Sequence, residues 1–133
     1  MTKATIQSIR VGTNDLERAR AFYDATFAAV GVSACSDLAK WPIAVYALGD
    51  GMRYLVGRAT NGEPAAHANG GTILLNVSDP ATVDAWHATG LANGGTCEGT
   101  PGPRDAIGGR YGAYLRDPDG NKLGCFVGSL FGV

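Results

Sequence analysis

The chain has 133 residues and a formal net charge of -1, with 11 basic and 12 acidic side chains. This length suits one domain with a buried core, and the balanced charge excludes the basic surface typical of nucleic-acid-binding proteins. We therefore expect no nucleic-acid partner. No stretch approaches the roughly 18 uninterrupted apolar residues of a membrane span, so we expect no membrane contact and a cytoplasmic location.

The cysteines point to the same compartment. The three residues, Cys35, Cys97 and Cys125, form no C-x-x-C pair and are odd in number. This pattern argues against a disulfide framework and against a structural zinc site. We therefore expect free thiols in a reducing environment.

The first half of the chain predicts a strand, a helix and a run of short strands. Residues 5–11 alternate well enough for a strand, and the NDLE sequence at 14–17 then predicts the start of a helix of about 15 residues. Gly31 follows the apolar stripe of this helix, where a left-handed C-cap is expected. Short antiparallel strands are predicted near 32–38, 42–48 and 52–58.

The pattern then restarts after an aperiodic linker. Residues 72–77 predict a strand, and Asp79 and Pro80 predict the N-cap and first position of a second helix. We interpret the Gly/Pro-rich segment 99–109 as a loop, which could form a mobile flap over the cavity. The remaining predicted elements are a strand at 109–116, the DPDGN turn at 117–121 and a strand at 122–127.

Two internal shifts relate the halves. A shift of 64 residues superposes the strand-helix units, for example Asp15 on Asp79, and a shift of 69 superposes the hairpins, with Asp50-Gly51 on Asp119-Gly120. We therefore predict an α+β fold of two tandem βαβββ modules in a single domain. The predicted boundaries are about 4–60 for the first module, 61–70 for the linker and about 71–128 for the second module.

Three segments carry a resemblance to a known family: VGTNDLERARAFYD (11–24), ATVDAWHATGLANGGTCEGTPGPR (81–104) and YGAYLRDPDGNKLGCF (111–126). In combination they resemble the vicinal-oxygen-chelate superfamily of glyoxalases, extradiol dioxygenases and bleomycin-resistance proteins, over nearly the whole chain. The resemblance implies a curled mixed sheet around one cavity, with the helices outside.

The resemblance also implies positions for metal ligands. Metal-dependent members of the superfamily hold a divalent ion with His on the first strand, His on the fifth, Glu on the eighth and sometimes a fourth ligand on the fourth strand. The matching positions in this chain are Ser8, Thr72, Gly124 and Leu55. A hydroxyl is a weak donor beside imidazole or carboxylate, so we expect no metal and no other cofactor, with a divalent metal as the family alternative.

Strand alternation predicts which side chains line the cavity. The set that we predict to bind a small molecule comprises Ser8, Arg10, Thr72, Asn76, Tyr111 and Phe126. Arg10 would bind a carboxylate through its fork of donors. The alternative is that Arg10 lies at the strand end and points into solvent.

Other polar residues favour structural roles. His87 lies on the inner stripe of the second helix and fits packing better than catalysis, and His67 is in the linker, within reach of a pocket mouth or solvated. Asp117 and Asp119 have the spacing of a carboxylate pair, but the DPDGN sequence fits a turn. Cys125 is expected to be buried and inert.

Three function classes remain open. The first is a metal-free protein of the bleomycin-resistance type that binds a small organic molecule, which the replaced ligand positions favour. The second is a glyoxalase- or dioxygenase-type enzyme, a lyase or isomerase with non-standard ligands, and the third is a structural protein with a vestigial cavity. A homodimer is expected and is compatible with all three.

Overall fold

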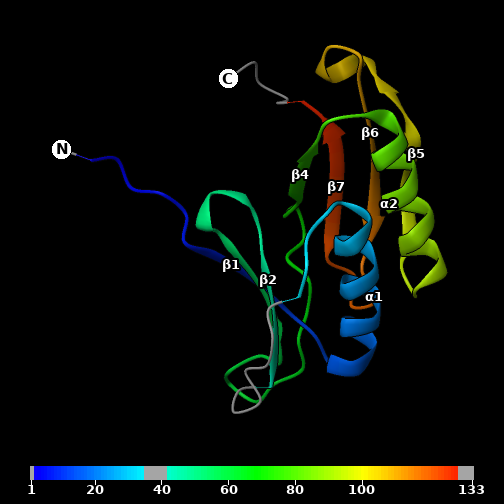
Figure 1. Ribbon diagram of the computed structural model, residues 1–133. Helices are drawn as coiled ribbons and strands as arrows, with labels where there is room; N and C mark the ends of the chain where they lie inside the picture. Colours follow the sequence, from blue (N-terminus) through cyan, green and yellow to red (C-terminus); the bar gives the residue numbers. More distant parts are fainter. Residues whose placement is uncertain (1, 35–41, 129–133) are drawn as a thin grey trace.

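The structure, a computed structural model, describes residues 2–34 and 42–128. Within these ranges the chain folds as two α-helices and seven strands in two mixed sheets (Figure 1). The main elements in chain order are β1 (Ser8–Gly12), α1 (Leu16–Ala29), β2 (Ile43–Ala47), β3 (Arg53–Gly57), β4 (Ile73–Val77), α2 (Pro80–Ala92), β5 (Thr96–Arg104), β6 (Arg110–Arg116) and β7 (Lys122–Val127). Most of the strand predicted near 32–38, and Cys35 with it, lies outside the described residues.

The strand register repeats the two shifts found in the sequence. The first sheet has the order β1-β3-β2 and the second β4-β7-β6-β5, with β1 parallel to β3 and β4 parallel to β7. Arg10 pairs with Leu55 in the first module, and Leu74 pairs with Gly124 in the second. The partners are related by shifts of 64 and 69 residues, so the α+β fold of tandem modules is confirmed.

Both helices begin where the sequence predicts. The carboxylate of Asp15 accepts a hydrogen bond from the backbone N–H of Arg18, and that of Asp79 accepts one from Thr82, at 3.1 and 2.8 Å. These side chains satisfy N–H groups that have no partner within the helix. In the described part of the chain, no helix is long and apolar enough to cross a membrane.

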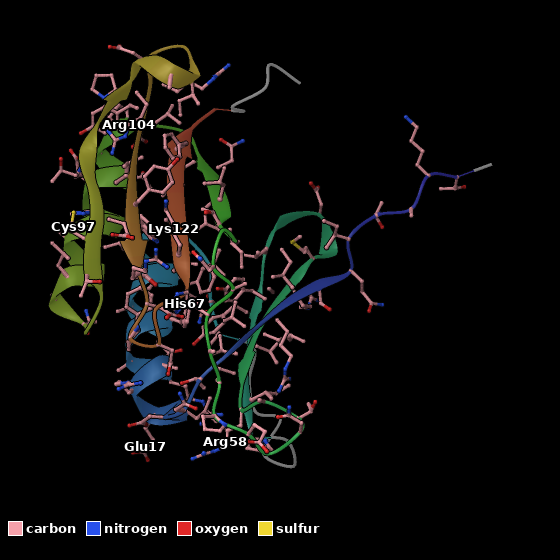
Figure 2. The ribbon with its side chains drawn as sticks, turned by 180° about the vertical axis from the view of Figure 1, so that it is seen from behind. Glu17, Arg58, His67, Cys97, Arg104 and Lys122 are labelled. Carbon is pink, nitrogen blue, oxygen red and sulfur yellow. The ribbon has the colours of Figure 1, made fainter. Side chains whose placement is uncertain are left out.

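One core joins the two modules. Helix α2 covers one face of the four-stranded sheet, and α1 packs against α2 and against β2 and β3 (Figure 1). Each sheet turns its other face away from the helices, and Figure 2 looks onto that face of the second sheet. The largest fully buried side chains include Phe22, Tyr23, Tyr46, Tyr54, Trp86 and Leu115. Tyr46 and Tyr54 therefore fill the core.

The loop predicted at 99–109 is wrong in its first part. Residues up to Arg104 belong to β5, which pairs with β6 at the edge of the second sheet. Two register shifts, between Cys97 and Gly99 and between Gly99 and Gly102, interrupt the ladder. Bulges and an edge position accommodate the glycines and prolines that resemble a loop in the sequence. Residues 99–104 are therefore part of a paired strand and not of a flap.

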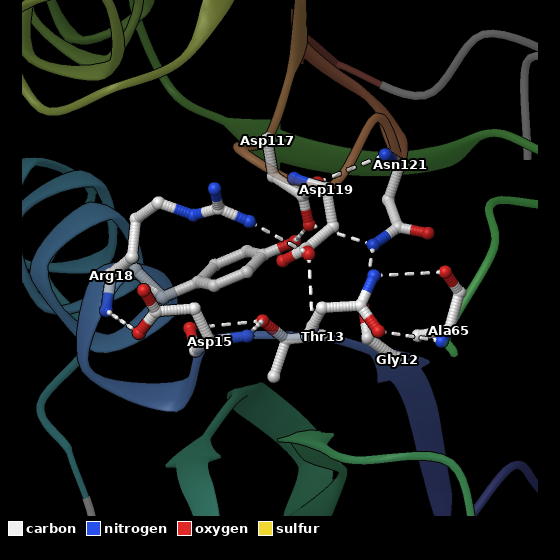
Figure 3. Close-up of polar contacts among 10 residues, drawn as sticks. Gly12, Thr13, Asp15, Arg18, Ala65, Asp117, Asp119 and Asn121 are labelled. Atoms are coloured by element: carbon white, nitrogen blue, oxygen red, sulfur yellow. Dashed lines mark hydrogen bonds and ion pairs between the residues drawn. The ribbon is translucent and has the colours of Figure 1, made fainter. Parts of the chain in front are cut away.

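A buried carboxylate organises the turn between β6 and β7 (Figure 3). Asp117 is 3% exposed, and its Oδ1 accepts hydrogen bonds from the backbone N–H groups of Asp119 and Asn121. Its Oδ2 accepts from the Asn121 amide and from the hydroxyl of Tyr23 on α1. Since Tyr23 has one proton to donate, the Tyr54 hydroxyl, 2.9 Å away, donates to the Tyr23 oxygen.

The same turn is attached to the connection between β1 and α1. Asp119 Oδ1 accepts from the backbone N–H of Asn14 and pairs with Arg18 at 3.0 Å. The Asn121 amide donates to the carbonyl of Gly12, and the Asn14 amide exchanges two hydrogen bonds with the backbone of Ala65 in the linker. The turn reading of Asp117 and Asp119 agrees with these contacts, which tie both modules and the linker together.

We predict that Tyr23→Phe lowers the free energy of unfolding by about 2 kcal/mol, because it removes a hydrogen bond to a buried carboxylate and leaves the Tyr54 hydroxyl without its acceptor. The matched control is Tyr111→Phe, which removes a hydrogen bond to the exposed carboxylate of Asp84 and should lower the free energy of unfolding by clearly less than Tyr23→Phe does. Urea denaturation measures both. Equal losses would show that the buried contact has no special weight.

Candidate functional site

The face of the second sheet that is turned away from α2 carries polar and aromatic side chains. On β4, Leu74 and Asn76 are exposed, whereas Ile73, Leu75 and Val77 pack against the core, as the alternation predicts. The residues of β7 and β6 on the open face are Lys122, Gly124, Phe126, Gly112, Tyr114 and Arg116.

The placement of Tyr111 on this face is wrong. Arg116 pairs with Lys122 and Tyr114 with Gly124, because the backbone of Asp117 donates to the Asn121 carbonyl and closes a five-residue loop. Tyr111 would lie on the open face only if the loop had four residues, because a register change of one residue moves every side chain to the other face. Tyr111 accordingly lies on the helix side, where its hydroxyl donates to Asp84 on α2.

Two glycines make room for side chains on the open face. A Cβ atom at Gly112 would lie 2.1 Å from the Phe126 ring, and one at Gly124 would lie 2.5 Å from Leu74 and 3.0 Å from the Tyr114 ring. Phe126 is thereby 1% exposed although it faces away from the core. The space that a side chain at position 124 would need is therefore occupied.

Tyr114 lies between two cations on this face. The Lys122 ammonium is 4.9 Å and the Arg104 guanidinium 5.9 Å from the centre of its ring, and Phe126 meets the ring edge to face at 5.2 Å. Figure 2 shows Lys122 and Arg104 on this side of the sheet. Cations over an aromatic ring are stabilised by its quadrupole, so the face joins positive charge to a flat apolar surface.

A cleft of about 320 Å³ lies beside this face, between the two modules. It brings together Arg10 from β1, Thr72 before β4 and Lys122 from β7. Its remaining lining residues are Val11, Gly12, Ala66, Ala68, Gly71, Ile73 and Asn121. The lining among the described residues thus contains two cations and no carboxylate, which favours an anion.

Arg10 is exposed, and its guanidinium is partly fixed. One terminal nitrogen donates to the carbonyl of Arg58, directly after β3, at 2.7 Å. Arg10 and Arg58 also line a second hollow, of about 430 Å³, next to the first. A guanidinium has five donors, and among the described residues only one of them has a partner, so the others can contact a ligand.

The other predicted residues are more scattered. Ser8 and Asn76 are exposed on β1 and β4, on the same faces as Arg10 and Thr72, and Phe126 is covered on the open face. Ser8, Asn76 and Phe126 do not line the cleft. The structure therefore brings Arg10 and Thr72 together and leaves the other four predicted residues outside.

Sequence reasoning missed Lys122 and Tyr114 as site residues, together with the linker alanines of the cleft. A signal for Tyr114 was present: in GRYGAYLR the apolar Ala113 and Leu115 share one face, and Tyr114 shares the other with the charged Arg116. The linker carries no periodicity, so nothing in it predicts contact with β1.

The surroundings of His67 and Cys125 favour structural roles for both residues. His67 is exposed in the linker, and its ring lies over the β6–β7 turn at Gly120 (Figure 2). Cys125 is buried on the helix side, where burial raises the pKa of its thiol to about 12. A thiol with such a pKa is protonated at neutral pH and is a poor nucleophile.

The residues at the family's ligand positions do not fit a metal ion. Ser8, Leu55, Thr72 and Gly124 offer two hydroxyls and no imidazole or carboxylate. At Gly124, Leu74 and Tyr114 occupy the space that a glutamate would need. Within residues 2–34 and 42–128, no group of three or more His, Cys, Asp or Glu side chains is arranged to hold a metal ion.

Comparison with known proteins places this arrangement in a family. The chain belongs to the Glyoxalase/Bleomycin resistance protein/Dioxygenase superfamily, whose model matches residues 5–124. It is 38% identical to a glyoxalase/bleomycin resistance protein from Albidiferax ferrireducens T118, with a TM-score of 0.81 over 93% of this chain and 98% of that one.

Other solved structures share the fold. A lactoylglutathione lyase from Agrobacterium tumefaciens is 25% identical, with a TM-score of 0.67 over 98% of each chain. A glyoxalase-related enzyme from Fulvimarina pelagi is 21% identical, with a TM-score of 0.75 over 93% of this chain and 88% of that one. A search of the curated proteins finds no match.

We predict that Gly112→Ala destabilises the protein by more than about 2 kcal/mol, because the buried Phe126 ring must move out of a close-packed position. Gly124→Ala should have a smaller effect, because Leu74 is 41% exposed and can turn away. Urea denaturation of both variants measures the difference. An effect of Gly124→Ala equal to that of Gly112→Ala would contradict this account of the open face.

Proposed function

We propose that this protein binds a small organic anion, without a metal, in the cleft between its two modules. The observation that carries the proposal is the convergence of Arg10, Thr72 and Lys122 on one cleft of about 320 Å³ that has no carboxylate in its described lining. Guanidinium, ammonium and hydroxyl groups are suitable donors for a carboxylate.

The surroundings favour a ligand with an apolar or aromatic body. Lys122 reaches both the cleft and the ring of Tyr114, and the exposed Leu74 side chain continues the apolar surface from there. Ligand sites commonly combine an apolar lining with a few polar groups that fix orientation. An aromatic carboxylate held at Arg10 and Lys122, with its ring toward Tyr114, satisfies both features.

The replaced ligand positions support binding over the metal chemistry of the family. A glyoxalase- or dioxygenase-type reaction that uses a divalent ion needs strong donors, and positions 8, 55, 72 and 124 supply none. We also propose a cytoplasmic location, which is supported by the free thiols of Cys97 and Cys125.

Titration with a panel of aromatic and aliphatic carboxylates tests the proposed site. We predict that Arg10→Ala and Lys122→Ala each weaken binding about tenfold or more, because each removes a charged donor to the carboxylate. The matched control is Arg20→Ala on α1, since Arg20 likewise donates to one backbone carbonyl, that of Ile43. Isothermal titration calorimetry measures the affinities.

Two outcomes would contradict the proposal. One is equal affinity in the wild type, Arg10→Ala and Lys122→Ala, or no binding by any carboxylate in the panel. The other is one EDTA-sensitive metal ion per chain after incubation with Ni, Zn, Mn or Fe salts, which would favour the enzyme alternative.

We further propose that the chain forms a homodimer through the open sheet faces. Ile6 before β1 is 65% exposed and Leu74 on β4 is 41% exposed, and within the described residues β1 and β4 each pair with a strand on one side only. Exposed apolar side chains beside an unpaired strand edge are typical of an interface.

We predict that Leu74→Arg shifts the protein toward monomer, because it places a charge in the proposed interface. Leu91→Arg is the control: Leu91 is 45% exposed but lies on α2, away from the open faces. Sedimentation velocity measures the oligomeric state of the wild type and both variants. A monomeric wild type, or equal effects of the two substitutions, would contradict the proposed dimer.

A further inference from the structure

A cysteine–histidine pair lies on the other face of the second sheet, away from the cleft. The Sγ atom of Cys97 on β5 is 3.2 Å from Nε2 of His87 on α2. Cys97 pairs across the ladder with Leu115, which packs against α2, so the thiol points toward the helix. The cleft lies at β4, and β5 forms the opposite edge of the same sheet.

The two side chains differ in their access to solvent. Cys97 is exposed, and Figure 2 shows it on the outer strand, whereas His87 is 6% exposed beneath it. Cys97 can therefore be approached from solvent, while the imidazole is held in place by packing. This combination of a reachable nucleophile and a fixed base is the arrangement that activates thiols.

The surroundings of His87 keep it able to accept a proton. Burial lowers the pKa of His87 below 6.5, and the negative charge of Asp84, one turn earlier on α2, opposes this in part. The imidazole is therefore neutral at pH 7. The Asp84 carboxylate accepts a hydrogen bond from the Tyr111 hydroxyl, which holds it in position. Its negative charge therefore lies near the imidazolium that forms when His87 takes the thiol proton.

We propose that Cys97 is a modification site that hydroperoxides oxidise, with His87 as the general base. His87 Nε2 takes the thiol proton, and the thiolate attacks the terminal oxygen of the hydroperoxide. The O–O bond breaks as the new S–O bond forms, the sulfur becomes a sulfenic acid, and the proton on His87 passes to the leaving alkoxide, which departs as an alcohol. The hydroperoxide is reduced by two electrons and the sulfur is oxidised by two.

The chain contains its own reference thiol. Cys125 lies on β7 of the same sheet and also faces the helices, but it is buried without an imidazole partner among the described residues. Because its pKa is raised to about 12, it should remain unreacted under conditions that oxidise Cys97. The difference between the two thiols isolates the effect of exposure and of His87.

The experiment exposes the full-length protein to cumene hydroperoxide and traps sulfenic acid with dimedone. Peptide mass spectrometry then measures the rate at each cysteine, in the folded protein and in urea. We expect Cys97 to react at least about tenfold faster in the folded wild type than in the unfolded chain, and His87→Gln to remove that advantage. Glutamine keeps a polar group near the sulfur but cannot take its proton. Cys97→Ser, which leaves the fold contacts in place, should give no adduct at this peptide.

Two results would overturn the proposal. The first is a rate for Cys97 in the folded wild type that is no higher than in urea, a comparison that needs no variant. The second is an unchanged rate in a His87→Gln protein whose circular dichroism and melting curve match the wild type. If His87→Gln does not fold, Asp84→Asn replaces it, with an expected several-fold slower oxidation, and an unchanged rate there would equally overturn the role of the pair.

Discussion

The buried carboxylate of Asp117 and its hydrogen-bond partners determine how the two modules meet. The two sheets share no strand pairing in the described part of the chain, so core packing and this polar junction set their relative position. A buried charge that loses its partners is strongly destabilising, and this one has four donors. Asn121 is among them and also lines the cleft. The junction therefore holds the strands that carry Arg10 and Lys122 at a fixed separation.

Local sequence chemistry was sufficient for much of this fold. The NDLE sequence at 14–17, the Asp79-Pro80 pair and the two internal shifts predict the two strand-helix units correctly, because capping and strand-helix periodicity depend on neighbours along the chain. The face of β6 could not be obtained in the same way. Which face each β6 side chain occupies depends on whether the loop between β6 and β7 has four or five residues. The contacts of Asp117 with Asn121 and with Tyr23, on a helix distant in the sequence, accompany the five-residue loop.

The candidate site was predictable only where strands alternate regularly. Arg10 and Thr72 were identified from the parity of β1 and β4, whereas the linker that completes their cleft carries no pattern. The 20 glycines of the chain have more than one role. Many glycines end helices or form turns, but Gly112 and Gly124 lie inside strands and make room for Phe126, Leu74 and Tyr114. Gly124 thus offers no side chain that could ligate a metal, and it leaves room for Leu74 and the Tyr114 ring.

The second sheet presents two separate chemistries on its two faces. The open face combines cations with aromatic rings near β4 and β7, and the helix face holds the thiol–imidazole pair at β5. The irregular edge connects the second chemistry to solvent, because the register shift after Cys97 interrupts pairing where the strand is exposed. Because β5 is the edge strand of the sheet, Cys97 is exposed to solvent, whereas α2 keeps His87 covered.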